Sequence, residues 1–343
     1  FRASGGVITT TQADSCGMIR NLPDVKSPSL TAGLALTIGL LAGCGNGSAG
    51  LPAPQPLSAT QAHPDRSASW MAPDAKRQAL LYVADLSTDD VDVYAYPNGK
   101  LKGVLTGFSA VHYECVDAAG NVFIADGSAN QLLEYAHGGT QPIKTYSEPG
   151  FVHGCSIDPT TGNLAVSHDP PSYAPGGISI YRHAQGKPRE YTTPNVFAVS
   201  FVGYDARGDL FVDGYDVSGA FAMAELPPKT HTFDAVTLNQ GIILPGAIQW
   251  DGQHLAVGDQ VSIFGPSKIY EFSMSGSTGT LVHTTPLSDS CDVLQFWIQG
   301  QRVIASNDCA SHVLYFGYPS GGSSTKTIGH DLQQPVGVAV SSK

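Results

Sequence analysis

The sequence predicts an all-β fold, a six-bladed β-propeller with four-stranded blades. The composition is turn-rich and weakly charged: 39 of the 343 residues are Gly, 23 are Pro, and 14% carry a charge. Across the repeats, apolar residues follow the strand period of two and not the helical period of 3.6. A short apolar motif recurs six times, 41 to 48 residues apart. That spacing is typical of one four-stranded blade per repeat.

The recurring motif is a five-residue apolar strand that ends on a small or polar residue. Its six copies occupy residues 81–85, 122–126, 164–168, 210–214, 255–259 and 303–307. A turn that begins with Asp and contains Gly, such as residues 117–120, precedes four of the copies and suits a β-hairpin. Alternating strands and more polar outer strands, such as 143–146, follow. Each repeat therefore accounts for one blade.

Parts of the repeat resemble a known family, the NHL-type propellers. The repeat of that family runs Pro-x-Gly-apolar-Ala-apolar-Asp, then a Gly-Asn turn and a Tyr-Val-Ala-Asp-like strand. Residues 335–340 (Pro-Val-Gly-Val-Ala-Val) and 245–248 (Pro-Gly-Ala-Ile) match the first part, and residues 120–126 (Gly-Asn-Val-Phe-Ile-Ala-Asp) match the second. The resemblance covers residues 80–341 and implies the architecture. More narrowly, the chain resembles uncharacterised bacterial lipoproteins of this shape.

The ends of the repeat region predict how the ring closes. The first blade begins at its second strand, near Leu80, and the chain finishes with an inner strand, 335–340, that has no blade of its own. If this last strand completes the first blade, no inner strand is left with an unpaired edge.

The region before the propeller has the order of an export signal. A short basic region with Arg20 and Lys26 follows Met18, and residues 30–41 form an uncharged, mostly apolar run. As a helix this run is too short for a bilayer core of about 30 Å. It leads into Leu-Ala-Gly-Cys ending at Cys44, which resembles the bacterial lipobox and implies lipid attachment to that sulfur. An ordinary secretory signal with a chance Cys is the alternative.

These features divide the chain into four predicted parts. They are an upstream segment (1–17), a lipoprotein signal peptide (18–43), a lipid-anchored flexible tether (44–77) and the propeller (78–343). The tether is rich in Pro, Ala and Ser and lacks periodic apolar residues, although Trp70 and Met71 could dock on the outside of the domain. By analogy with lipoproteins, Gly45 implies placement at the outer membrane or cell surface, with the lipid as the only membrane contact.

The charge balance restricts the partners. The formal net charge is −11 and the pI is about 5.3, and there is no basic run. Because an acidic surface repels phosphate backbones, no nucleic-acid binding is expected. The expected partner is an envelope protein, a glycan or a small ligand, and the protein is expected to be a monomer.

Four of the six cysteines lie inside the propeller, and export permits disulfides. Cys291 and Cys309 flank a predicted hairpin centred on Gly300, so they would face each other across the first two strands of one blade. Cys115 and Cys155 lie on inner strands of neighbouring blades, one position out of register, and could also be linked. Buried free thiols are the alternative, because no close pair has the spacing of a zinc site.

The candidate functional residues gather on one predicted face. Inner strands begin there and second strands end there, around the central channel. His112, Glu114 and His153 lie along inner strands, with His112 and His153 at equivalent positions. The second strands end in Asp85, Asp126, His168, Asp259 and Asn307. These groups could ligate one Ca²⁺ or Zn²⁺ or exchange protons. The alternative is that the Asp residues cap turns and the His residues only line the channel.

Two functions are consistent with this pattern. The first is a binding or interaction scaffold, since there is no Gly-x-Ser-x-Gly elbow, phosphate loop or His-Glu-x-x-His motif. The second is a metal-dependent hydrolase or lyase, because six-bladed relatives that resemble gluconolactonases hold one divalent ion above the channel. That resemblance would assign Glu114, Asp126, Asp259 and Asn307 as ligands here. A purely structural surface protein is a third interpretation.

Overall fold

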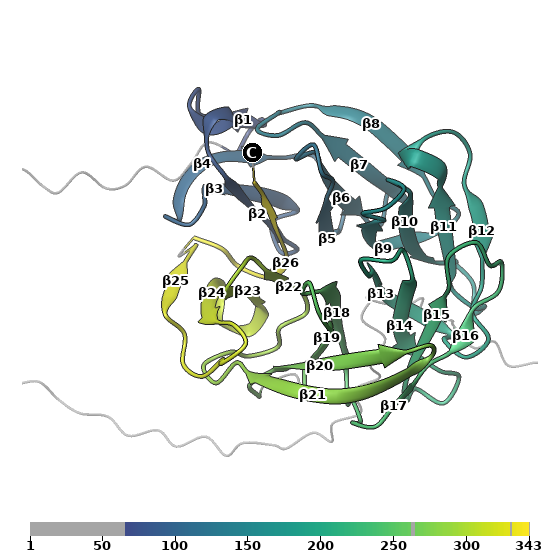
Figure 1. The fold of residues 1–343 in the computed structure, drawn as a ribbon. Helices are drawn as coiled ribbons and strands as arrows, with labels where there is room; N and C mark the ends of the chain where they lie inside the picture. Colours follow the sequence, from purple (N-terminus) through teal and green to yellow (C-terminus); the bar gives the residue numbers. More distant parts are fainter. Residues whose placement is uncertain (1–65, 262–264, 330, 343) are drawn as a thin grey trace, which may run out of the picture. The chain divides into compact units, whose positions relative to one another are not determined.

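The computed structural model describes residues 66–342 apart from 262–264 and 330. Six sheets of four or five strands follow one another around a ring, which Figure 1 shows along its axis. The predicted all-β, six-bladed propeller is therefore confirmed. The predicted signal peptide, Cys44 and the first part of the tether lie outside the described residues.

Each blade is a single sheet, and its strands follow one another from the channel outward. Blade 1 contains β26 (Pro335–Ser341), β2 (Leu80–Asp85), β3 (Asp90–Ala95), β4 (Lys100–Leu105) and β1 (Trp70–Met71). Blade 2 contains β5 (Val111–Val116), β6 (Val122–Asp126), β7 (Gln131–Tyr135) and β8 (Pro142–Ser147). Blade 3 contains β9 (Phe151–Ile157), β10 (Leu164–Asp169), β11 (Gly177–Tyr181) and β12 (Arg189–Tyr191).

The second half of the ring repeats this plan. Blade 4 contains β13 (Ala198–Tyr204), β14 (Leu210–Tyr215), β15 (Phe221–Leu226) and β16 (Asp234–Ala235). Blade 5 contains β18 (Pro245–Trp250), β19 (Leu255–Asp259), β20 (Lys268–Ser275), β21 (Thr278–Pro286) and β17 (Thr237–Leu238), which lies parallel to β21. Blade 6 contains β22 (Phe296–Ile298), β23 (Arg302–Asn307), β24 (His312–Gly317) and β25 (Lys326–Ile328).

Single-turn 3₁₀ helices complete the secondary structure of the described residues. They are η1 (Ala75–Arg77), η2 (Arg182–Ala184) and η3 (Asp308–Ala310). None of these has the length or apolar character needed to cross a membrane.

The strand directions define two faces of the ring. Every inner strand begins at one face, the upper face, and ends at the other, the lower face. The upper face carries the connections between blades and the turns between second and third strands. The lower face carries the turns between first and second strands.

The core lies between adjacent blades, which explains why the recurring motif is so apolar. Each second strand is covered by neighbouring blades on both sides, and all residues of β2, β6 and β19 are buried. The largest fully buried side chains include Tyr82 and Phe123 of such strands. A strand buried on both faces shows a continuous apolar run in place of strict alternation.

The C-terminal strand closes the ring, as predicted. β26 pairs antiparallel with β2, with Leu81 opposite Val340 and Val83 opposite Val338. Asp85 at the end of β2 strengthens this closure: its carboxylate accepts hydrogen bonds from the backbone N–H groups of Gln333 (2.6 Å) and Gln334 (3.0 Å). The two ends of the propeller are thus joined within blade 1.

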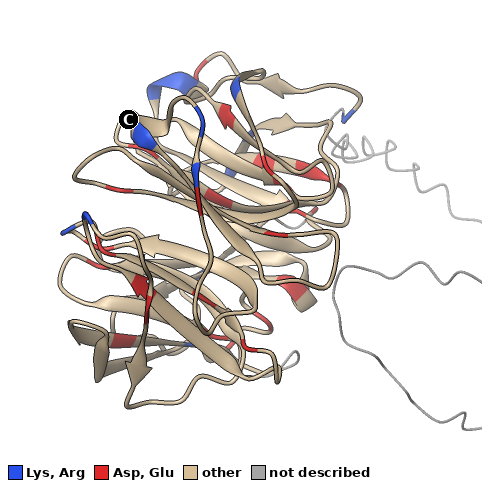
Figure 2. Cartoon of the chain, turned by 90° about the vertical axis from the view of Figure 1, so that its right-hand side faces the viewer, with Lys and Arg blue, Asp and Glu red and all other residues tan. Residues whose placement is uncertain are grey.

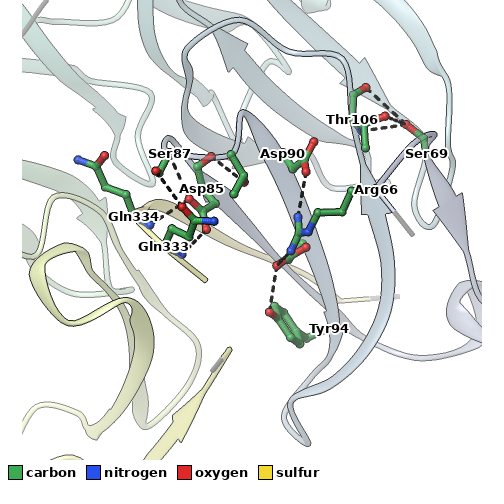
Figure 3. A network of polar contacts seen from close by, with 11 residues as sticks. Arg66, Ser69, Asp85, Ser87, Asp90, Tyr94, Thr106, Gln333 and Gln334 are labelled. Atoms are coloured by element: carbon green, nitrogen blue, oxygen red, sulfur yellow. Dashed lines mark hydrogen bonds and ion pairs between the residues drawn. The ribbon is translucent and has the colours of Figure 1, made fainter. Parts of the chain in front are cut away.

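A strap formed by residues 66–78 covers the outer edge of blade 1. β1 pairs with β4, which confirms that Trp70 and Met71 dock on the domain. Arg66 donates to Asp90 (2.9 Å) and Asp92 (3.0 Å) on β3, and Tyr94 also donates to Asp92 (Figure 3). The sequence predicts residues 66–77 as tether, but these contacts make them part of blade 1. The segment was not predicted as a strand because its composition is polar. An edge strand such as β1 can form through backbone pairing alone.

Two disulfides tie the ring. Cys115 of β5 is bonded to Cys155 of β9, with their Cα atoms 5.7 Å apart, and this bond joins blades 2 and 3. Cys291 and Cys309 are also bonded, with a Cα separation of 5.8 Å. Both predicted pairings are therefore present, although Cys291 precedes β22 and Cys309 lies in η3. Such bonds indicate maturation in an oxidising compartment.

Candidate functional site

The inner strands of blades 2 to 5 each contain a β-bulge near the upper face. The pairing register shifts between Val111 and Glu114 in β5, and again near the start of β9, β13 and β18. A bulge places an extra residue on one strand and turns side chains away from the regular alternation. Here the bulge positions in β5 and β9 hold His112 and His153, which explains their equivalence.

The bulges direct two aromatic rings against each other. Tyr113 of blade 2 and Phe201 of blade 4 stack with their ring centroids 4.3 Å apart. Gly154 of blade 3 leaves the space between them, because a Cβ there would lie 3.3 Å from Cβ of Tyr113. Tyr113 and Phe201 are almost fully buried. The two rings thus join the inner strands of blades 2 and 4.

The upper mouth brings His112 and His153 together, with ring centroids 6.0 Å apart. His153 Nε2 lies 3.0 Å from Oδ2 of Asp169, while Oδ1 of Asp169 accepts a hydrogen bond from the backbone of Val199. Burial, and secondarily the neighbouring His153, lowers the pKa of His112 to about 3. His112 is therefore a neutral ring packed against Phe151.

The polar residues that end the second strands serve as caps. Asp126 accepts from the backbone of Ser109 (2.7 Å), Asp259 from Leu244 (3.2 Å) and Asn307 from Cys291 (2.6 Å). Each side chain thus holds the segment that leads into the inner strand of its own blade. These residues and Asp85 therefore act as caps, which was the alternative interpretation. None of them belongs to either of the two groups of His, Asp and Glu that converge in the described residues.

Glu114 is the most enclosed of the predicted site residues. Only 1% of its surface is exposed, and neither carboxyl oxygen has a hydrogen-bond partner in the described residues. Its carboxyl group lies near Tyr82 of blade 1, since it contributes to the raised pKa of that phenol. Burial raises the pKa of Glu114 itself well above its ordinary value. Burial in the wall of the ring therefore favours the neutral form of Glu114.

The amide of Gln295, just before β22, holds the wall together next to Glu114. Its Oε1 accepts from the backbone N–H groups of Glu114 (3.1 Å) and Val338 (2.9 Å), and its Nε2 donates to the carbonyl of Glu114 (2.7 Å). One side chain of blade 6 thus bonds the inner strands of blades 1 and 2.

His168 points away from the channel and joins a different set of residues. Its Nε2 lies 3.1 Å from Oε2 of Glu190 on β12, and Glu148, from the connection between blades 2 and 3, lies beside them. A second convergent group is formed by Asp251, His254 and Glu271 of blade 5. The predicted single site above the channel is therefore divided between separate locations.

The lower mouth of the channel is hollow. A cavity of about 310 Å³ is lined by the ends of the inner strands, including Glu114 of β5, Trp250 of β18, and Gln295 and Trp297 at β22. Trp250 and Trp297 are partly exposed, and Nε1 of Trp250 has no hydrogen-bond partner in the described residues. The side-chain amide of Gln249 forms hydrogen bonds with the backbone N–H and carbonyl of Ile298.

A groove continues from this cavity along the seam between blades 2 and 3. It encloses about 840 Å³ and shares Val116, Ile157 and Pro159 with the cavity. Its outer part is lined by Ile143, which is 58% exposed. Charged residues along it are Asp117, Glu134, Asp158 and Lys144. The lower face therefore presents one continuous, mostly apolar hollow with an acidic border.

Of the predicted candidate residues, only Glu114 lines the lower cavity. The others lie toward the upper face, and the remaining residues that line the lower hollow were missed. Trp250 and Trp297 stand in ordinary apolar strands, so nothing marks them as lining residues. A signal was available in Asp117 and Asp158, which begin the turns at the lower ends of β5 and β9. Both residues were explained by their place in turns, so they did not indicate a binding site.

No protein-family model matches the sequence, and no curated protein matches it. Solved structures do share its fold. A chain in the crystal structure of a nidogen/laminin complex is 12% identical with a TM-score of 0.62, covering 77% of this chain and 98% of that chain. A functionally unknown protein from Desulfotomaculum acetoxidans has 12% identity and a TM-score of 0.54, over 76% of this chain and 98% of the other.

A protein of unknown function from Bacteroides caccae is also similar, with 11% identity and a TM-score of 0.57, over 78% of this chain and 100% of that chain. At these identities the likeness shows the fold alone.

Proposed function

We propose that this protein is a lipid-anchored binding protein of the cell envelope, of the NHL-like kind, whose lower face receives an extended segment of a partner protein. The observation that carries the proposal is the hollow that runs from the two tryptophans at the channel mouth into the groove between blades 2 and 3. The lipobox-like sequence at Cys44 supports the anchor, and the two disulfides support an oxidising location.

The chemistry of the hollow favours a protein segment over a glycan. Sugar recognition needs many free polar side chains, but Gln249 and Gln295 already bond to the backbone of neighbouring strands. Apart from the charged residues of the groove, the lining is mainly aromatic and aliphatic surface, the kind that anchors protein partners.

The charge of the hollow favours a basic segment. Three carboxylates and one Lys line the groove. Figure 2 shows acidic residues outnumbering basic ones on the side of the ring that it presents. A partner with Lys or Arg beside its apolar anchor would be attracted to this border. The propeller in the nidogen/laminin complex is an example of the same fold within a protein–protein complex.

The chain's three tryptophans allow a direct test. In a Trp70→Phe variant of the full chain, the remaining indoles, Trp250 and Trp297, both line the cavity. The probes are a synthetic extended peptide with Lys and Leu around a central Tyr, the same peptide with Glu in place of Lys, and a neutral oligosaccharide. We expect a saturable change in emission with the basic peptide and a weaker one with the acidic peptide.

Two exposed isoleucines provide a matched control. Ile143 lies in the groove and is 58% exposed, whereas Ile243 lies on the upper face and is 59% exposed. Ile143→Arg should weaken binding of the basic peptide about tenfold or more, and Ile243→Arg should leave it unchanged. A response to the oligosaccharide alone, or equal effects of the two substitutions, would contradict the proposal.

A further inference from the structure

Glu148, His168 and Glu190 converge at the upper end of the seam between blades 2 and 3. Glu148 belongs to the connection between the blades, His168 to β10 and Glu190 to β12. One potential ligand atom from each lies within 4.8 Å of the other two. Gly177, opposite His168, leaves room for the ring, since a Cβ there would lie 2.4 Å from its Cε1.

Hydroxyl groups connect the two carboxylates. Ser179 Oγ lies within hydrogen-bonding distance of Glu148 Oε2 and 2.8 Å from Glu190 Oε1. A hydroxyl group has one proton and can donate to only one of them. Tyr181 donates to Oε1 of Glu148 (2.7 Å). The carboxylate oxygens of Glu148 and Glu190 therefore outnumber the hydroxyl protons available to them from Ser179 and Tyr181.

The cluster holds two carboxyl groups beside a single imidazole, and burial raises the pKa of Glu148. Neither glutamate forms an ion pair with Lys or Arg among the described residues, and His168 is the nearest group that could carry a positive charge. Glu148 is 8% exposed and His168 is 5% exposed, so water screens them poorly. His168 Nδ1 also lacks a partner in this part of the chain. Buried carboxylates without a cation are costly.

The geometry points to a site for one Zn²⁺ held by Glu148, His168 and Glu190. An imidazole nitrogen and two carboxylate oxygens are good zinc ligands at bond lengths of about 2.1 Å. Calcium is disfavoured, because it takes six to eight oxygen ligands and does not prefer imidazole. Glu190 is half exposed, with 50% of its side chain accessible, so a water molecule can complete four-coordination.

Such an ion has a structural consequence. Zinc would bridge the inter-blade connection to the second and outer strands of blade 3. The Cys115–Cys155 disulfide joins the same two blades near the channel. The seam that forms the groove on the lower face would then be fixed both at its inner edge and at its upper end. The zinc site is independent of the proposed peptide binding, so either can fail alone.

The test is zinc content and thermal unfolding of the full chain, purified with both disulfides intact, stripped with EDTA and dialysed after incubation with ZnCl₂. Wild type should keep about one zinc per chain, and its Tm should rise with free zinc concentration. Glu190→Gln and His168→Gln should lose both effects. Glu190→Gln changes a half-exposed side chain and keeps every histidine, so it should unfold like wild type in EDTA.

The matched control is His254→Gln, in the second convergent group. There Asp251 is satisfied by Tyr318 (2.7 Å) and two backbone N–H groups, and Glu271 by Thr285 (2.9 Å). This variant should bind zinc like wild type. Absence of bound zinc in wild type, or equal zinc in Glu190→Gln, would overturn the assignment. Loss of zinc only in His254→Gln would move the ion to blade 5 and also overturn it.

Discussion

At the scale of the residue, Glu114 is the least expected feature of the ring. Its carboxyl group is enclosed between blades 1 and 2 without a hydrogen-bond partner in the described residues. Its backbone N–H and carbonyl, by contrast, both form hydrogen bonds with the side chain of Gln295. Because burial disfavours the charged form, the folded protein holds this proton more tightly than the unfolded chain does.

This proton makes stability depend on pH in a defined direction. The contribution of Glu114 is complete below its ordinary pKa of 4.5 and is lost as the pH rises through the raised pKa of the folded state. Glu114→Gln cannot ionise. Its unfolding free energy relative to wild type should therefore increase as the pH rises from 5 to 8.

Denaturant unfolding at several pH values measures this difference. Asp234→Asn, at the exposed outer edge of blade 4, is the control and should run parallel to wild type. If Glu114→Gln also runs parallel to wild type, the carboxyl group is not buried in the folded protein.

Local chemistry made some residues predictable and left others hidden. Asp at the end of a repeated strand suggests a cap, and Asp85 and Asp126 do bond to backbone N–H groups. The partners of His168 gave no such signal. Glu148 and Glu190 lie 20 and 22 residues away in polar segments, and only the pairing of β10, β11 and β12 brings them together.

At the scale of the element, β26 carries the closure of the ring. Val336, Val338 and Val340 are at most 2% exposed, and each contributes about 1.5–3 kcal/mol by burial. The strand also pairs with the edge of β2, and its Val338 N–H donates to Oε1 of Gln295. A whole domain of this kind is stable by only about 5–15 kcal/mol.

Removal of residues 335–343 should therefore abolish cooperative folding. Circular dichroism during heating and limited proteolysis would both report the loss. Removal of residues 342–343 alone is the control, since β26 ends at Ser341, and it should leave the Tm unchanged. A long truncation that melts like the full chain would show that β2 does not need this partner.

The elements themselves were largely predictable, whereas their bulges were not. The period of the apolar motif placed all six second strands, because burial on both sides imposes the same composition on each. The bulges in β5, β9, β13 and β18 have no common residue signature: the bulged positions hold His-Tyr, His-Gly, Ser-Phe and Gly-Ala. Only the folded ring shows how such positions pack, as in the stacking of Tyr113 against Phe201.

At the scale of the whole molecule, the two faces differ in structure. The upper face is occupied by caps and inter-blade connections, with the proposed zinc site at one seam. The lower face is hollow, and its hollow runs from Trp250 and Trp297 to Ile143. This difference could not be predicted from the repeat, because the repeat places equivalent residues in every blade while the groove depends on one seam.

The proposed function requires that the partner bind the lower face. The most direct measurement is photo-cross-linking in cells, with a photoreactive amino acid at position 143 in the groove or at position 243 on the upper face. The two replaced isoleucines are almost equally exposed, so accessibility does not bias the comparison. We predict a discrete protein adduct from position 143 that Trp250→Ala weakens, and none from position 243. An adduct from position 243 alone, or equal adducts from both, would contradict the claim.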